Sequence, residues 1–186
     1  MHALRWTILG ASALALAACG HKTETATTNV TSDTSVNQTV VAPAAAPGQD
    51  FANTAASSDA FEIASSQLAA TQGKSPAVKK FASEMIAAHT DSTAKLKAAA
   101  GVAAQPVTPD PTLTAEQQQT LDSLKPLIGA DFDKAYAAAQ VDAHQKTLDA
   151  LKAYSASGDV PQFKDFATKL VPIVTAHLNM AKGLKP

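Results

Sequence analysis

The chain has 186 residues, of which 46% are hydrophobic and only 5% aromatic, so alanine supplies much of the apolar content. Alanine favours helices and offers little bulk for the core of a sheet, which predicts an all-α domain. The formal net charge is −1. There is no basic run and no aromatic platform, so nucleic-acid binding is not expected.

The first segment, residues 1–18, has the three parts of a secretory signal peptide. Arg5 supplies the positive charge, residues 6–15 form an apolar run too short to cross a bilayer, and small residues follow. The ending LAAC resembles the lipobox of bacterial lipoproteins, which implies cleavage before Cys19 and lipidation of that residue. Gly20 after the cysteine then implies sorting to the outer membrane, facing the periplasm. The alternatives are a secreted protein with a stray cysteine and an uncleaved anchor.

Removal of this leader changes what the chain can bind. Arg5 is the only arginine, and its loss leaves 14 lysines against 16 acidic residues, a net charge of −2. No guanidinium then remains to bind phosphate through two parallel hydrogen bonds. Cys19 is the only cysteine, so neither an internal disulfide nor a thiolate metal site is expected.

Residues 19–50 are rich in Thr, Ser, Pro and Ala and lack helical periodicity. We interpret them as a disordered tether that holds a domain of residues 51–186 roughly 30 Å from the lipid. A β-prone Thr/Val segment that pairs with a partner is the alternative for this stretch.

Four long helices and one short helix are expected in the domain. Gly73 and Gly158 act as C-terminal stops, Pro76 and Pro161 fall in first turns, and Thr114 begins a capping-box pattern. The expected bounds are 51–73, 76–100, 115–124, 130–155 and, opened by Asp159 and Pro161, a last helix to 184.

An internal repeat relates two of these helices. The sequences PAVKKFASEMI (76–86) and PQFKDFATKLV (161–171) match in register, and each follows a helix that ends at glycine. The chain therefore reads as two helical hairpins joined by roughly 30 residues that contain the short helix. That connection is long enough to cross a bundle of about 35–40 Å, which predicts a ferritin-like four-helix bundle. An up-down-up-down bundle is the alternative.

Each long helix directs one ionisable residue toward the core when residues are placed at 100° steps. All four lie roughly 18–27 Å from their hairpin turns, near the middle of the bundle. They are Glu62, His89, His144 and His177. Three imidazoles and a carboxylate that converge would suit a divalent metal such as Zn, Cu or Fe.

One other interpretation of these residues competes with the metal site, and a di-iron enzyme site is excluded. Neutral histidines that hydrogen-bond to nearby polar groups could instead form a layer that fixes helix register; the candidate partners are Glu62, Ser65, Ser92, Thr93, Tyr136 and Thr147. A ferritin-type di-iron site is not encoded in its usual form, because residues 86, 141 and 174, three before each histidine, are not acidic. Met85 and Met180 would suit copper, but filling core gaps is the simpler role for them.

Three stretches carry a family resemblance: LAATQGKSPAVKKFASEMIAAHT, GADFDKAYAAAQVDAHQKTLDAL and FKDFATKLVPIVTAHLNMA. Through them residues 61–184 resemble the bacterial envelope family named domain of unknown function 4142. The resemblance implies an exported or lipid-anchored ferritin-like bundle with no established activity. His89, His144 and His177 match the usual histidines of the family and Glu62 a common glutamate, whereas Ala64 stands where a second acid is common.

Two functions follow from the sequence. The first is a non-enzymatic binding or structural module of the cell envelope, attached to the membrane through the lipid on Cys19, with structural histidines and an unidentified protein partner. The second is a metal-binding protein, with redox activity as a further possibility. A metal site requires imidazole nitrogens within about 4 Å of one point, whereas a polar layer requires each ring to have a hydrogen-bond partner.

Overall fold

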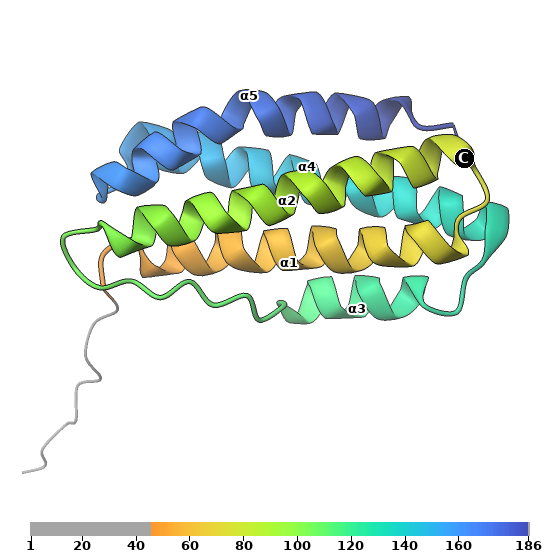
Figure 1. The fold of residues 1–186 in the computed structure, drawn as a ribbon, viewed down its shortest axis with the longest axis horizontal. Helices are drawn as coiled ribbons and strands as arrows, with labels where there is room; N and C mark the ends of the chain where they lie inside the picture. Colours follow the sequence, from red (N-terminus) through yellow and green to blue (C-terminus); the bar gives the residue numbers. More distant parts are fainter. Residues whose placement is uncertain (1–45, 186) are drawn as a thin grey trace, which may run out of the picture. The chain divides into compact units, whose positions relative to one another are not determined.

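The computed structural model describes residues 46–185, which form a bundle of helices (Figure 1). The predicted signal peptide, Cys19 and most of the predicted tether lie outside these residues. The helices are α1 (Gln49–Gln72), α2 (Pro76–Gly101), α3 (Ala115–Leu124), α4 (Gly129–Ser157) and α5 (Pro161–Gly183). All five predicted helices are confirmed to within two residues at each end. None of them is long and apolar enough to cross a membrane.

The helix starts follow the expected local chemistry. Pro76 and Pro161 occupy the first turns of α2 and α5, where a missing N–H costs nothing. Thr114 and Gln117 form both hydrogen bonds of the capping box of α3. α1 begins at Gln49, two residues earlier than expected, so the last two residues of the predicted tether are helical.

The two hairpin turns have the same backbone shape. Gly73 and Gly158 both adopt extended conformations, with φ/ψ of −65°/149° and −61°/149°. Glycines that end helices usually adopt the left-handed conformation, but these two do not, so glycine is needed here for another reason. A Cβ at Gly73 would lie 2.6 Å from the carbonyl oxygen of Ala69, and one at Gly158 would lie 2.4 Å from the Tyr154 ring. Lack of space requires glycine at both turns. The two hairpins therefore share a turn geometry as well as the repeated sequence at the start of their second helices.

The connection between the hairpins runs the length of the bundle (Figure 1). Gly73, after α1, pairs with Gly129 at the start of α4, so α1 and α4 are antiparallel. Gln162, at the start of α5, donates a hydrogen bond to the carbonyl of Val102, after α2, so α2 and α5 are antiparallel as well. This is the predicted ferritin-like order, and the up-down-up-down alternative is wrong.

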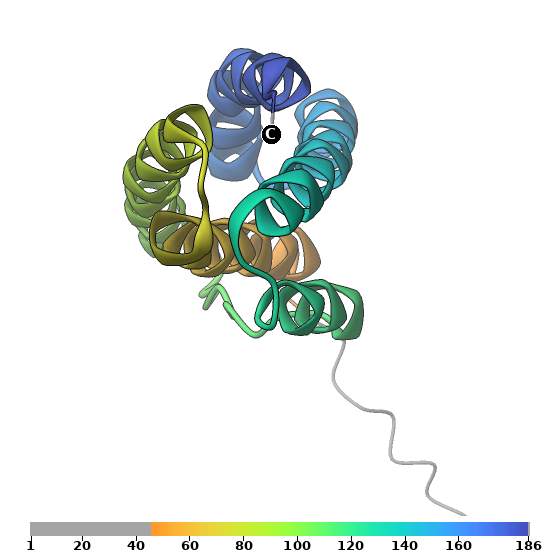
Figure 2. The same cartoon turned by 90° about the vertical axis from the view of Figure 1, so that its right-hand side faces the viewer.

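Viewed along its axis, the bundle has α1, α2, α5 and α4 around a square, with α3 outside against α1 and α4 (Figure 2). The extended first part of the connection is held to α1. Gln49 donates to the carbonyl of Thr108 at 2.7 Å, and Asn53 accepts from the backbone of Asp110 at 3.1 Å. Leu124 of α3 is buried, so the crossover is part of the packed structure.

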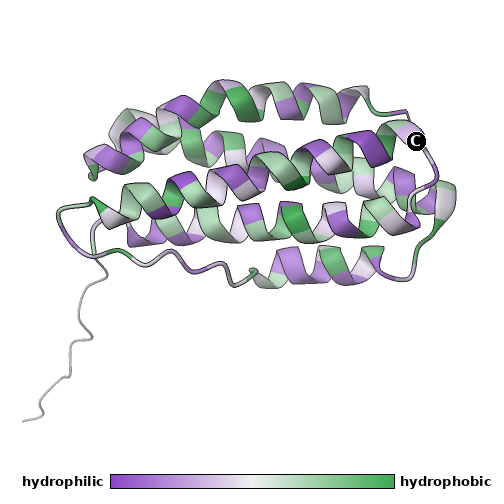
Figure 3. Ribbon diagram, in the orientation of Figure 1, coloured by the Kyte–Doolittle hydropathy of each residue, from purple (hydrophilic) through white to green (hydrophobic). Residues whose placement is uncertain are grey.

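The core has two apolar clusters, one toward each end of the bundle. One is built around Phe51, Leu96, Leu148 and Phe163, and the other around Phe81, Met85, Phe132 and Tyr136. Hydrophilic and hydrophobic residues alternate along every helix (Figure 3). Between the clusters lies a layer of buried polar side chains, which comprises Asp59, Glu62, Ser65, Ser66, His89, Ser92, Gln140, His144 and His177.

Candidate metal centre

Three histidines from three helices meet in the polar layer. His89 comes from α2, His144 from α4 and His177 from α5, and they are 4%, 1% and 9% exposed. Their ring centroids are 5.6–5.7 Å apart in every pair, and the planes are mutually tilted by 55–78°. The rings therefore form a nearly equilateral group and do not stack.

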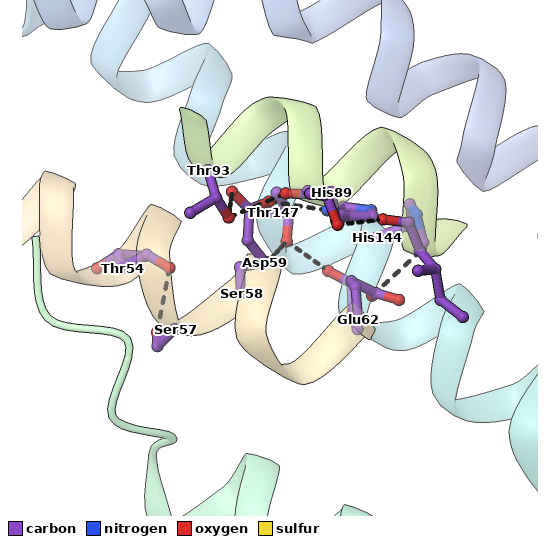
Figure 4. A network of polar contacts seen from close by, with 12 residues as sticks. Thr54, Ser57, Ser58, Asp59, Glu62, His89, Thr93, His144 and Thr147 are labelled. Atoms are coloured by element: carbon purple, nitrogen blue, oxygen red, sulfur yellow. Dashed lines mark hydrogen bonds and ion pairs between the residues drawn. The ribbon is translucent and has the colours of Figure 1, made fainter. Parts of the chain in front are cut away.

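His89 is oriented by a carboxylate from α1. Its Nδ1 lies 2.8 Å from Oδ1 of Asp59, which is itself buried, and Oδ2 of Asp59 accepts a hydrogen bond of 3.2 Å from Thr93 (Figure 4). A carboxylate accepts only, so Nδ1 of His89 carries the proton of this bond. In the neutral ring Nε2 then keeps its lone pair, and in the structure that atom is buried with no hydrogen-bond partner.

His144 is oriented by its own helix. Its Nδ1 donates to the backbone carbonyl of Gln140, one turn earlier, at 2.9 Å. This bond fixes the same tautomer as in His89, and Nε2 of His144 is likewise buried without a partner. On His177 the buried nitrogen without a partner is Nδ1.

The three rings are close enough to share one ligand. Each of the three histidines offers a ligand nitrogen, and the three lie within 4.8 Å of one another. Three nitrogens at this separation lie within about 2.8 Å of a common centre. A zinc–nitrogen bond is shorter, about 2.0–2.1 Å. A small inward movement of each ring would complete a three-histidine site. Imidazole donors suit Zn, Cu, Fe or Ni and do not suit Mg or Ca.

Glu62, the fourth residue of the predicted site, is placed differently. It is 1% exposed, but its oxygens do not belong to the nitrogen cluster. Its Oε1 lies 3.4 Å from Nδ1 of His144, on the ring edge that already donates to Gln140 (Figure 4). In this geometry Glu62 stands behind a candidate ligand and is not a fourth ligand itself.

The carboxylate of Glu62 is buried at an energetic cost. Neither of its oxygens has a hydrogen bond of good geometry, although the amide of Gln140, which donates to Ser65 at 3.1 Å, is close enough to favour the ionised form. Burial raises the pKa of Glu62 to about 7, and the charge of nearby His89 and the amide of Gln140 oppose this rise. Such a group needs a neighbouring positive charge to stay ionised, which a bound cation would supply.

The histidines also differ in proton affinity. Burial lowers the pKa of His144 to about 3 and that of His177 to about 4, with the charge of His89 adding to both effects. Burial also lowers the pKa of His89, but the hydrogen bond to Asp59 and the charges of Asp59 and Glu62 raise it more. At neutral pH, His144 and His177 are therefore uncharged, the form that binds a metal.

The sequence interpretation missed several residues of the layer. Asp59 is three residues before Glu62, a spacing that shares a helix face, and that was the available signal. Gln140 precedes His144 by four residues on the same face. Of the partners proposed for a purely structural layer, Tyr136 bonds to Ser66 at 2.7 Å and Thr147 to Ser58 at 2.6 Å, and both bonds join α1 to α4.

The two methionines have different surroundings. Met85 is fully buried in the core, as expected of a gap-filling side chain. Met180 is 40% exposed, so the expectation that it fills a core gap is wrong.

Fold and site together define a ferritin-like four-helix bundle with a buried three-histidine cluster at its centre. The sequence model of the family described as "Domain of unknown function (DUF4142)" matches residues 30–184. The chain belongs to this family, as the resemblance indicated, and the match begins within the predicted tether.

Comparison with other proteins adds one solved structure. The bundle is similar to the structure titled "CopM in the Cu(II)-bound form", with a TM-score of 0.61 and 15% sequence identity over 75% of this chain and 96% of that one. At this identity the similarity establishes a shared fold. No curated protein matches the chain.

Proposed function

We propose that this protein is a non-enzymatic copper-binding module of the bacterial cell envelope, and that His89, His144 and His177 hold the metal. One observation carries the proposal. Each of the three buried imidazoles has a nitrogen without a hydrogen-bond partner, and the three rings each bring a nitrogen within 4.8 Å of the others. A layer that served only helix register would pair these atoms, because a buried polar atom without a partner is costly.

Copper is favoured over the other candidate metals for two reasons. Among divalent first-row metals, nitrogen sites bind Cu(II) most tightly. The structural relative with the same fold is described as Cu(II)-bound. Zinc accepts the same three ligands and is the competing metal that an experiment must include.

The location of the protein forms part of the proposal. The lipobox-like sequence before Cys19, followed by Gly20, supports a lipid-anchored protein of the outer membrane that faces the periplasm. Replacement of Cys19 by Ser should release the protein from the membrane fraction. Retention of the Cys19→Ser variant in that fraction would contradict the lipid anchor.

A register-fixing polar layer is the second candidate for the cluster, and a specific observation favours it. Nδ1 of His89 and Nδ1 of His144 both make good hydrogen bonds, at 2.8 and 2.9 Å, which hold α2 to α1 and orient the ring of α4. In that case the rings contribute stability without binding a ligand.

Metal analysis of the full chain, purified in detergent without an affinity tag, separates the two candidates. Copper and zinc are titrated into the wild type and into a His89→Ala/His144→Ala/His177→Ala variant, which retains the histidines outside the cluster as an internal control. We expect one copper per chain that the triple variant lacks. Equal metal binding by the two proteins, or none by either, would favour the structural layer.

A further inference from the structure

We propose that Asp59 is the positioning residue of the metal centre: it presents Nε2 of His89 to the metal and makes the site selective for Cu(II) over Cu(I). The inference rests on the proposed function and deepens it. It concerns a residue that does not itself touch the metal.

The geometry around Asp59 is that of a carboxylate that supports a ligand. Its Oδ1 accepts from Nδ1 of His89 at 2.8 Å. The hydroxyl of Thr93 lies 3.2 Å from its Oδ2 and shares its proton with the backbone carbonyl of His89 at 2.9 Å. Asp59 is 4% exposed, so its carboxylate is largely shielded from water. Because the acceptor-only carboxylate requires the proton on Nδ1, the lone pair of the neutral ring stays on Nε2, which is buried without a hydrogen-bond partner.

The charge of Asp59 gives the selectivity. Asp59 and Glu62 place two buried acidic side chains within one turn of α1, and no lysine is buried within residues 46–185. With three neutral imidazoles as ligands, a dication balances two carboxylates, whereas a monocation leaves one buried negative charge unbalanced. Loss of the Asp59 charge should therefore weaken Cu(II) binding more than Cu(I) binding.

The two acidic residues provide a matched comparison. Asp59→Asn and Glu62→Gln each remove one buried negative charge with almost no change in shape. Asp59 hydrogen-bonds to the ring of His89, whereas Glu62 lies 3.4 Å from Nδ1 of His144 and makes no hydrogen bond to His89. An asparagine can also turn its NH₂ group toward Nδ1, which stabilises the tautomer with the proton on Nε2, and that tautomer cannot bind metal through Nε2.

The experiment measures the Cu(II) and Cu(I) affinities of the full chain by competition with chelators, with the Cu(I) series under reducing conditions. A Cys19→Ser background removes the thiol, and the triple histidine variant gives the contribution of sites outside the cluster. The variants are Asp59→Asn, Glu62→Gln, Thr93→Val and Ser58→Ala. Ser58 precedes Asp59 and bonds to Thr147, so its loss tests general damage to α1.

We expect Asp59→Asn to weaken Cu(II) binding by about 10–100-fold, the usual effect of losing the partner of a histidine ligand. Cu(I) binding should change less, and the nitrogen hyperfine pattern in the Cu(II) EPR spectrum should lose one nitrogen. Thr93→Val should produce a smaller change of the same kind, and it tests the idea even if Asp59→Asn does not fold. Ser58→Ala should lower stability and leave both affinities unchanged.

Three results would overturn the inference. An Asp59→Asn protein with wild-type Cu(II) affinity and spectrum would show that Asp59 does not position His89. A Glu62→Gln protein with an equal loss of affinity and of nitrogen coupling would show that overall charge acts alone. Absence of copper binding by the wild type would instead refute the proposed function itself, a failure distinct from the other two.

Discussion

Asp133 ties the two hairpins together, and its replacement should reveal how much that contact contributes. Asp133 lies in the first turns of α4 but is 2% exposed. Its carboxylate accepts from the backbone N–H of Lys74 at 3.0 Å and from that of Ser75 at 2.7 Å. Both donors belong to the turn before α2, where the side chain of Ser75 makes no capping bond.

The size of the effect follows from these contacts. A hydrogen bond to a charged group contributes about 1.5–3 kcal/mol, and a negative charge near a helix N-terminus adds about 0.3–1 kcal/mol. Lys74 is exposed and Ser75 half-buried, so water can replace part of the loss. We therefore expect Asp133→Ala to lower the free energy of unfolding by about 3 kcal/mol. Asp133→Asn keeps one acceptor and should lose about half as much.

Urea denaturation of the metal-free protein, followed by circular dichroism, measures these changes. Asp149→Ala is the matched control, because Asp149 is exposed on the same helix and should change stability by less than about 0.5 kcal/mol. The reasoning is refuted if Asp133→Ala unfolds at the same urea concentration as the control. It is also refuted if Asp133→Asn is as damaging as Asp133→Ala.

Three further predictions concern buried groups. Tyr136→Phe leaves the hydroxyl of Ser66 without its 2.7 Å partner and should cost about 1–3 kcal/mol in urea denaturation; a change below that range would mean that water or a new partner satisfies Ser66. Gly48→Ala should destabilise by about 1–3 kcal/mol in the same assay, because φ is +76° and a Cβ would lie 2.7 Å from the ring of Phe163; a neutral effect would argue against that close contact. The pKa of Glu62 is raised to about 7 in the folded protein, from 4.5 in the unfolded chain. Between pH 4.5 and 7 the folded protein therefore keeps a proton that the unfolded chain has lost, and the free energy of unfolding falls as the pH rises. Glu62→Gln should remove that decline. Across this range the free energy of unfolding of the metal-free variant should rise relative to the wild type by up to about 1.4 kcal/mol per pH unit. Parallel plots of stability against pH for the two proteins would refute the raised pKa of Glu62.

The sequence by itself determined the helices and their order. Alanine content, glycine stops and prolines in first turns act over a few residues, so all five helices could be located within two residues of their observed ends. The repeat at Pro76 and Pro161 indicated two hairpins, and the length of the connection favoured the crossover that the bundle has. The 3.6-residue period also placed His89, His144 and His177 on core faces, because that direction depends only on the helix itself.

Only the tertiary structure decided how the polar groups pair. The contact of Asp59 with His89 joins residues 30 apart in the chain, and that of Asp133 with the α2 turn joins residues 58 and 59 apart. Helical periodicity shows that Glu62 faces inward, but not that it lies behind His144, since the rotation and relative height of packed helices set which atoms meet. Periodicity fixes the direction of a side chain from its own helix. The bond that leaves Nε2 of His89 free comes from another helix, so it depends on how the helices pack.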